Sequence, residues 1–266
     1  MTNFMGLPNI AEAKVLVVPV PYEKKVAYKV GTRNGPEAIL RASNELYLYD
    51  EILETEAYQK GINTLKPATN LKDLEKLPTD KFVIGLGGEH TISLPLIKRF
   101  DQKDLSILHI DAHADMKDEF DGSRMSHVCV MRRVSEFNKN IVQVGVRGLD
   151  KDELDYMKEK KIKTFFAHKK FDIKEIVKNL KKNVYVSIDL DAFDPSVFPD
   201  VGTPEPNGLT WKQVNDLLME VFSKRNVVGC DVVELCPNAN SQLSDYSAAK
   251  LVYRIVGLKD KFVKDT

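Results

Sequence analysis

Six short apolar runs, separated by longer and more polar segments, most strongly constrain the fold of this chain. The runs cover residues 15–21, 82–86, 105–110, 141–146, 184–188 and 227–233. Continuous apolar runs of this length are typical of strands that are buried on both faces of a parallel sheet. The prolines Pro19 and Pro21 are expected to end the first run, because proline cannot donate to a sheet ladder.

Segments with a helical pattern lie between these predicted strands. They cover residues 35–43, 91–99, 151–161, 174–182 and 210–222. Pro36 suits the first position of a helix, Thr210 suits an N-cap, and Pro95 falls inside its segment. Alternating strands and helices predict an α/β fold, a parallel sheet with helices on both faces. No linker or internal repeat is visible, so we expect a single domain over residues 1–266.

The amino-acid composition limits which partners and which cellular compartment we expect. With 266 residues, of which 43% are hydrophobic, the chain can bury a sizeable core. Its 39 basic and 39 acidic residues balance, which argues against nucleic acid or an anionic membrane as partner. We see no secretory signal pattern and no apolar run long enough to span a bilayer. The three cysteines suit free thiols in a reducing compartment, so we expect a soluble, cytoplasmic protein.

Histidine and aspartate side chains follow three of the apolar runs, 82–86, 105–110 and 184–188. They are His90 after the first, Asp111, His113 and Asp115 after the second, and Asp189 and Asp191 after the third. Strand ends of an α/β sheet meet at one edge, and residues two apart in an extended segment share a side. So many carboxylates would repel one another without bound cations. We therefore predict two ions that share Asp111 and Asp189; Mn²⁺ suits these ligands, and Zn²⁺, Fe²⁺ or Co²⁺ would also fit.

Single members of this set have plainer interpretations. His90 alone could be a buried structural histidine, and His168 has no acidic neighbour in the sequence. Asp194, which precedes Pro195, is typical of a turn. The occurrence of three strand-ending clusters in one chain is what favours a metal site.

Six motifs distributed along the chain match one known family. They cover residues 31–39, 87–93, 111–115, 187–195, 202–206 and 231–237. In these motifs, and over nearly its whole length, the chain resembles the ureohydrolases, which include arginases and agmatinases. The resemblance implies a three-layer α/β/α sandwich around a mostly parallel eight-stranded sheet.

The resemblance also implies roles for single residues. One Mn²⁺ would be held by His90, Asp111, Asp115 and Asp189, and a second by His113, Asp111, Asp189 and Asp191. A hydroxide that bridges the two ions would attack the substrate, and Asp115 would hold it and pass its proton to the leaving amine. Glu234 would pair with the guanidinium group, and His127 would shuttle protons near the mouth of the site. A nucleophilic pair of Cys129 and His127 is a weaker alternative, because the hydroxide already supplies the nucleophile.

Two features favour agmatine as the substrate, with putrescine, a polyamine, and urea as products. The Gly-Gly-Glu-His motif of residues 87–90 looks more like agmatinases than arginases. The loop that carries Asp118, Glu119 and Asp121 would suit a cationic amine tail better than a carboxylate. A simple solvated loop remains the alternative for these three residues.

Other functions remain open at this point. Arginase, guanidinobutyrase and formimidoylglutamase activities are alternatives, since Val201 and Asn207 replace glycines that many agmatinases have near the site. A non-catalytic homologue is a further alternative, although no expected ligand is missing. The Asp-x-Asp of residues 189–191 argues against an amide hydrolase of the deacetylase type. The resemblance implies a homo-oligomer, trimeric or hexameric, that acts on a small cationic guanidino compound.

Overall fold

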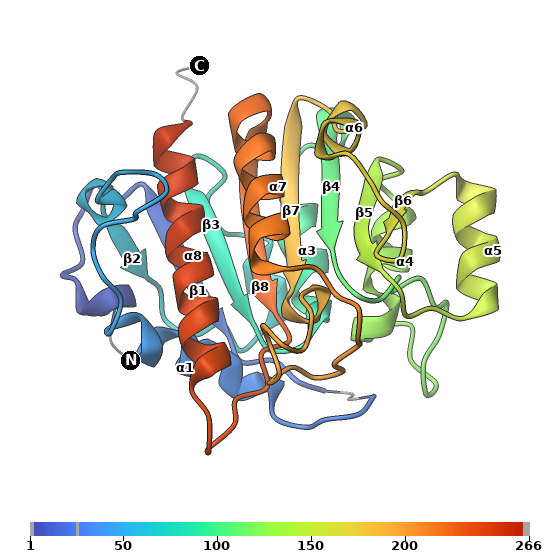
Figure 1. Cartoon of the computed structure of the whole chain (residues 1–266), viewed down its shortest axis with the longest axis horizontal. Coiled ribbons are helices and arrows are strands. Elements are labelled where there is room, and N and C mark those ends of the chain that lie inside the picture. Colours follow the sequence, from blue (N-terminus) through green and yellow to red (C-terminus); the bar gives the residue numbers. More distant parts are fainter. Residues whose placement is uncertain (1–2, 25–26, 263–266) are drawn as a thin grey trace.

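The computed structural model describes residues 3–24 and 27–262 and contains a sheet of eight parallel strands (Figure 1). The strands are β1 (Val15–Val20), β2 (Ile62–Thr64), β3 (Phe82–Gly87), β4 (Leu105–Ile110), β5 (Ile141–Val146), β6 (Lys163–Phe166), β7 (Asn183–Asp189) and β8 (Asn226–Val233). Their order in the sheet is β2-β1-β3-β8-β7-β4-β5-β6. The predicted α/β sheet is confirmed, and it is parallel throughout.

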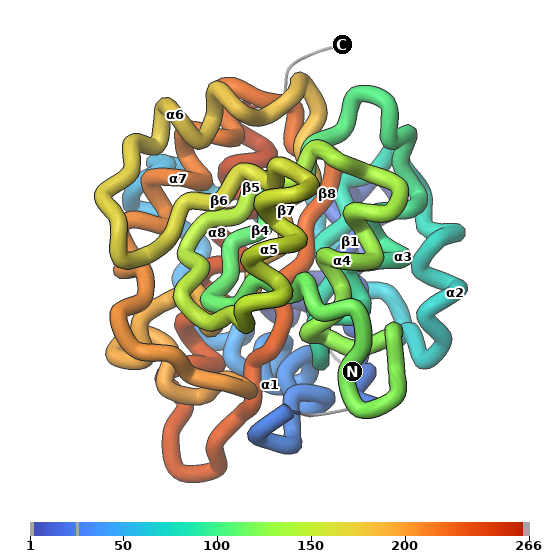
Figure 2. Tube along the Cα trace, turned by 90° about the vertical axis from the view of Figure 1, so that its right-hand side faces the viewer, coloured from blue at the N-terminus to red at the C-terminus, as the bar shows by residue number. Residues whose placement is uncertain are grey.

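Helices cover both faces of the sheet. They are α1 (Gly35–Ser43), α2 (Leu71–Leu74), α3 (Ser93–Lys98), α4 (Val130–Ser135), α5 (Lys151–Lys160), α6 (Ile173–Lys178), α7 (Trp211–Lys224) and α8 (Leu243–Lys261). One apolar core joins the sheet to α1, α6, α7 and α8, and a second joins it to α2, α3, α4 and α5. Figure 2 shows α6 and α7 on one side of the strands and α2 and α3 on the other. The predicted three-layer sandwich is therefore confirmed.

The expectation that prolines end the first strand is wrong for Pro19. Pro19 lies inside β1 and pairs in register with Leu86 of β3. The Pro19 carbonyl accepts a hydrogen bond from Ala68 N (2.9 Å), on the β2 side of β1. The Pro19 nitrogen faces the same side, where the short strand β2 has already ended. A proline costs little there, because no ladder bond is lost.

Five of the strands and α-helices, β2, β6, α2, α4 and α8, were not predicted. Strands β2 and β6 are short, lie at the two edges of the sheet and are partly exposed, so their sequences lack the continuous apolar run of a central strand. Helix α8 buries every residue from 251 to 258 and so shows no single apolar stripe. Pro95 is tolerated in α3 because it occupies the third helical position, where the N–H needs no helical partner.

Three further features concern the cysteines, the length and polarity of the helices, and the domain organisation. Cys129, Cys230 and Cys236 are all buried and form no disulfide. No helix among residues 3–24 and 27–262 is long and apolar enough to cross a bilayer. The assignment of residues 1–266 to one domain stays a prediction.

The N-terminus of α7 provides a test of local stability. Thr210 and Gln213 form the capping box, in which Gln213 N donates to Thr210 Oγ1 (3.2 Å) and Thr210 N donates to Gln213 Oε1 (2.8 Å). Replacing Thr210 with alanine should lower the free energy of unfolding by about 1 kcal/mol and the melting temperature by about 2–4 °C. Thermal unfolding followed by circular dichroism measures this, with Thr79→Ala at an exposed position as control. Equal melting temperatures for the two variants would contradict the prediction.

Candidate functional site

Polar side chains gather where four neighbouring central strands end, toward the lower edge of the sheet in Figure 1. Glu234 directly follows β8, Asp189 is the last residue of β7, and Asp111 directly follows β4. His90 begins a short 3-10 turn (His90–Ile92) after β3. Because β7 and β8 lie between β3 and β4 in the sheet, the three predicted clusters meet at one place.

The first half of the site is a buried group around His90. His90 Nδ1 lies 3.1 Å from Asp111 Oδ2, 3.2 Å from Asp115 Oδ2 and 3.4 Å from Asp189 Oδ2. None of these side chains is more than 5% exposed. Asp115 has a left-handed backbone (φ 54°), an uncommon conformation for a non-glycine residue that often marks functional sites. The turn after Asp111 thereby brings Asp115 back toward His90.

The second half of the site is built around His113. His113 Nδ1 lies 2.9 Å from Asp191 Oδ2 and 3.6 Å from Asp111 Oδ1. Asp191 sits in a 3-10 turn after β7, and its N–H donates to Asp189 Oδ1 (2.8 Å). Asp111 thus presents one carboxylate oxygen to each half of the site. The structure brings the six predicted ligands together. Five of them belong to two groups that could hold metal and share Asp111, and Asp189 joins the first group through its contact with His90.

The electrostatics of this cluster call for bound cations. Burial, together with the neighbouring carboxylates, raises the pKa of Asp189 and Asp191 above its usual range. Burial alone would lower the pKa of His113, but Asp191 and Asp111 raise it to about 12. Within residues 3–24 and 27–262, His90 Nδ1 and Asp111 Oδ2 are buried and make no hydrogen bond. Oxygen and nitrogen ligands that converge in this way fit divalent cations, which would satisfy these atoms and offset the repulsion.

His109 is a buried site residue that the sequence analysis did not identify. Its Nε2 lies 2.8 Å from Asp111 Oδ2, and its Nδ1 lies 3.1 Å from Gln143 Nε2. The Gln143 amide nitrogen also donates to the carbonyl of Ala114 (2.7 Å), and Thr164 Oγ1 donates to the amide oxygen (3.2 Å). An amide nitrogen only donates, so His109 Nδ1 accepts and the ring carries its proton on Nε2.

This tautomer defines what His109 does in the site. With this tautomer the proton of His109 is on Nε2, 2.8 Å from Asp111 Oδ2, so the imidazole is a close neighbour of that carboxylate and has no lone pair to offer a metal ion there. Partners of this kind orient metal-binding side chains. One signal in the sequence could have found it, since His109 precedes Asp111 by two residues in an extended strand and therefore shares its face.

Glu234 forms the wall of the site beside His90. It is 8% exposed, its Oε1 accepts a hydrogen bond from the His90 backbone N–H (2.7 Å), and its backbone is left-handed (φ 65°). Burial raises the pKa of the Glu234 carboxyl well above its usual range. A Cβ at Gly202 would lie 2.8 Å from Glu234 Oε2, so a larger residue at this position would force the carboxylate to move.

His127 lies outside the two groups that could hold metal. It begins a 3-10 turn (His127–Cys129) before α4, with its ring 6.0 Å from the ring of Phe120 and its Nδ1 3.3 Å from Ser126 Oγ. Burial and the charge of Asp115 raise the pKa of the Cys129 thiol to about 11. A thiol that stays protonated is a poor nucleophile, so this raised pKa argues against the alternative pair of Cys129 and His127.

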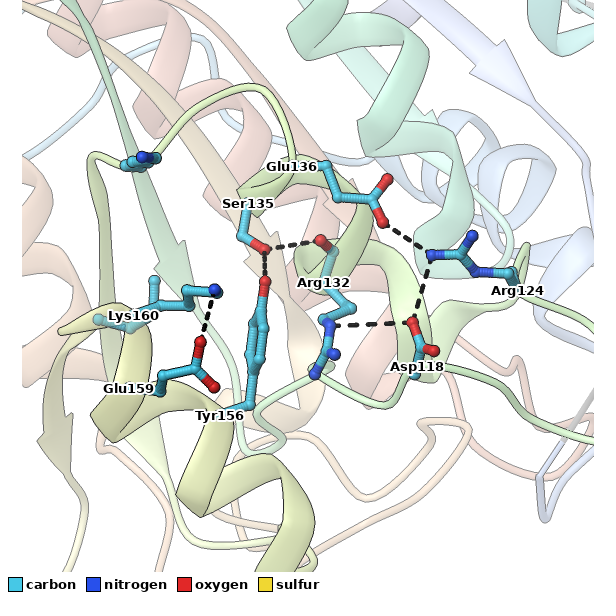
Figure 3. Close-up of a pocket in the computed structure, with 10 residues that line it drawn as sticks. Asp118, Arg124, Arg132, Ser135, Glu136, Tyr156, Glu159 and Lys160 are labelled. Atoms are coloured by element: carbon cyan, nitrogen blue, oxygen red, sulfur yellow. Dashed lines mark hydrogen bonds and ion pairs between the residues drawn. The ribbon is translucent and has the colours of Figure 1, made fainter.

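The structure pairs Asp118 with arginines, so it gives no support to a role for Asp118 in binding the substrate amine. Asp118 Oδ1 lies 2.5 Å from Arg133 Nη2 and 3.3 Å from Arg124 Nη2; Figure 3 shows the contact with Arg124. The hydrogen bond from Arg133 lowers the pKa of the Asp118 carboxyl. Its charge is therefore already compensated by arginines. Glu119 is exposed, in keeping with the solvated-loop alternative.

Asp118 belongs to a charged cleft of about 610 Å³ between the 118–124 loop, α4 and α5. The cleft is lined by Asp118, Arg124, Arg132, Ser135, Glu136, Lys139, Tyr156, Glu159, Lys160 and Ile162. The guanidinium carbon of Arg132 lies 3.2 Å from the centre of the Tyr156 ring, and Ser135 Oγ lies 2.8 Å from the Tyr156 hydroxyl. None of the predicted metal ligands lines this cleft, which is therefore a surface feature separate from the site.

Comparisons with known proteins agree with this architecture. The Arginase family matches residues 13–257. The chain is 40% identical over 267 aligned positions to the N(1)-aminopropylagmatine ureohydrolase of Thermus thermophilus, a match that covers 93% of this chain and 91% of that protein. It is 33% identical over 269 positions to the agmatinase of Bacillus cereus, with 92% and 91% covered.

A solved structure shows the same fold. The agmatine ureohydrolase of Thermoplasma volcanium superposes on this chain with a TM-score of 0.89 and 25% identity, covering 98% of this chain and 95% of that one. The family match spans most of the residues, and the curated relatives cover more than nine tenths of the chain. The chain therefore belongs to the arginase family of ureohydrolases, enzymes that hydrolyse C–N bonds of guanidino compounds.

Proposed function

We propose that this ureohydrolase acts on a guanidino compound whose tail carries a cationic amine, with agmatine as the substrate predicted from the sequence. Water and agmatine would give putrescine and urea, which is a step of polyamine synthesis. The observation that carries the proposal is the buried group in which Asp111 is shared between His90 on one side and His113 on the other, next to Glu234.

Two Mn²⁺ ions per chain are the proposed cofactor. One would be held by His90, Asp111, Asp115 and Asp189, and the other by His113, Asp111, Asp189 and Asp191. When bound, such a pair of cations supplies a hydroxide nucleophile near neutral pH, because the cations lower the pKa of water. The converging ligand atoms and the repulsion among buried carboxylates support this assignment.

The chain's own residues would position the substrate and move the proton. Glu234 would bind the guanidinium group through charge-assisted hydrogen bonds, which orient its planar carbon toward the nucleophile. A cation next to Glu234 would also hold this buried carboxyl in its ionised form. Asp115 would hold the nucleophile and pass its proton to the leaving amine. His127 would exchange that proton with solvent near the mouth of the site.

A second candidate substrate is N1-aminopropylagmatine, which would give urea and a longer polyamine. The chain is 40% identical to the Thermus thermophilus enzyme named for this substrate and 33% identical to the Bacillus cereus agmatinase. Both substrates carry a guanidinium group at one end and cationic nitrogen in the tail, so one site chemistry would serve both. The cytoplasmic location and the trimeric or hexameric homo-oligomer stay predictions.

The proposal is tested by urea release from Mn²⁺-loaded protein with agmatine, N1-aminopropylagmatine and arginine at equal concentrations. We expect release from one or both amine-tailed substrates, little from arginine, and none after the metal is chelated. The metal content, measured by plasma mass spectrometry, should be two ions per chain. Arginine as the best substrate, or full activity after chelation, would contradict the proposal.

A further inference from the structure

Glu205 lies beside the metal-ligand cluster, and the proposed mechanism leaves its carboxylate unused. Glu205 Oε1 is 3.9 Å from His113 Nε2, on the side of the imidazole opposite Nδ1, which faces Asp111 and Asp191. The Glu205 side chain is 37% exposed and that of His113 is 23% exposed. Glu205 therefore stands one imidazole ring away from the buried carboxylates, at the side of the cluster that is open to solvent.

The Glu205 carboxylate makes few side-chain interactions within the described part of the chain. Its contact with His113 is the one side-chain ion pair or hydrogen bond that it makes there, and at 3.9 Å this contact is too long for a hydrogen bond. Two other acidic side chains, in contrast, accept several hydrogen bonds. Asp194 accepts hydrogen bonds from Ser196 and Gly208, and Glu23 accepts them from backbone N–H groups. Glu205 is thus a carboxylate that can pair with a cation from a ligand.

The backbone around Glu205 is held in place by Arg147. The guanidinium of Arg147 donates to the carbonyls of Glu205 (2.7 Å), Pro206 (2.9 Å) and Asp191 (2.8 Å). These bonds tie the loop that carries Glu205 to the turn that carries Asp191. The backbone that carries Glu205 is therefore held in a fixed place relative to Asp191, which favours recognition of a substrate group.

Glu205 lies three residues after Gly202, which contacts Glu234. At one end of this loop, Gly202 N donates to the carbonyl of Glu234 (3.1 Å), and Gly202 packs against the Glu234 carboxylate. At the other end, Glu205 reaches His113. Three residues of backbone span at most about 10 Å, so this short loop ties the place of Glu205 to that of the Glu234 carboxylate.

We propose that Glu205 recognises the cationic amine in the tail of the substrate and so determines the preference for amine-tailed guanidino compounds. This inference rests on the proposed function, in which Glu234 takes the guanidinium group at the buried end. Pairing of a carboxylate with an ammonium in a partly buried setting changes affinity by about tenfold or more. An anionic tail would be repelled at the same position.

The test compares Glu205→Gln with the wild type, both as full-length Mn²⁺-loaded protein. The substrates are agmatine, N1-aminopropylagmatine, butylguanidine with an uncharged tail and 4-guanidinobutyrate with an anionic tail. We expect kcat/KM for agmatine relative to butylguanidine to fall about tenfold, mainly through a higher KM, and the ratio for 4-guanidinobutyrate to rise. Glu45→Gln removes an exposed carboxylate elsewhere and serves as the matched control.

Metal affinity, measured by calorimetry, separates this role from a structural one. If Glu205 only orients His113, Glu205→Gln should weaken metal binding and lower kcat/KM equally for all four substrates, and this result would overturn the inference. Unchanged selectivity in an active variant would overturn it as well. A wild type that releases no urea from either amine-tailed substrate would instead refute the proposed function, and the inference with it.

Discussion

Replacing Asp111 with alanine is expected to abolish metal binding and urea release together. Its Oδ2 faces His90 and its Oδ1 faces His113, so this carboxylate serves both halves of the site. Metal ions contribute several kcal/mol to such hydrolyses, so kcat/KM should fall by about a thousandfold or more. Steady-state kinetics and the number of metal ions per chain measure the two effects in one preparation.

Two control variants distinguish loss of metal binding in the Asp111 variant from loss of folding. Asp111→Asn preserves the shape of the side chain, and its fold is checked by circular dichroism, since His109 and the N–H of His113 also contact this carboxylate. Asp80→Ala removes an exposed aspartate and should retain full activity and metal content. A folded Asp111→Ala protein that still bound two ions and kept activity within tenfold of the wild type would refute the shared role.

Replacing Glu234 with glutamine should cause the second largest loss of activity while metal binding persists. Glutamine keeps an oxygen that can accept the hydrogen bond from His90 N, but it removes the charge that pairs with a guanidinium group. A hydrogen bond to a charged group contributes about 1.5–3 kcal/mol, so kcat/KM should fall about 10- to 150-fold. Kinetics with agmatine, together with the metal content per chain, measure the result.

Thermal stability and a surface variant serve as controls for the Glu234 experiment. The melting temperature should not fall, because a buried neutral amide costs less to desolvate than a buried carboxylate. Glu12→Gln at an exposed position is the control and should match the wild type. Loss of the metal ions from Glu234→Gln, or a change in kcat/KM smaller than twofold, would show that Glu234 does not bind the substrate.

Much of the fold could be predicted because its determinants are local. Continuous apolar runs identify the six inner strands, and the capping residue Thr210 marks the start of α7. The edge strands β2 and β6 escaped prediction because partial exposure interrupts their apolar pattern. Helix α8 escaped it because a helix buried on most of its surface has no polar face to reveal its period.

The substrate-binding groups were harder to predict than the metal ligands. Asp118 shares a loop with Glu119, and both have the charge that an amine would need, but only the folded chain brings Arg124 and Arg133 to Asp118. Glu205 lies in the motif of residues 202–206, but no role for its side chain was predicted from the sequence; only the folded chain brings it to His113, more than ninety positions away. Contacts between residues distant in sequence decide which charges are paired and which are available.

The sequence by itself determined the residue types of the candidate metal site and their places at strand ends, because a spacing of two residues in extended backbone puts side chains on one face. Tertiary structure alone decided that β7 and β8 insert between β3 and β4, which brings Asp111 and Asp189 to 3.1 Å and 3.4 Å from His90 Nδ1. It also decided the tautomer of His109, through Gln143 on the neighbouring strand β5. Strand order and side-chain pairing depend on how helices pack over both faces of the sheet. This packing joins residues that are far apart in the sequence, so no local sequence pattern predicts it.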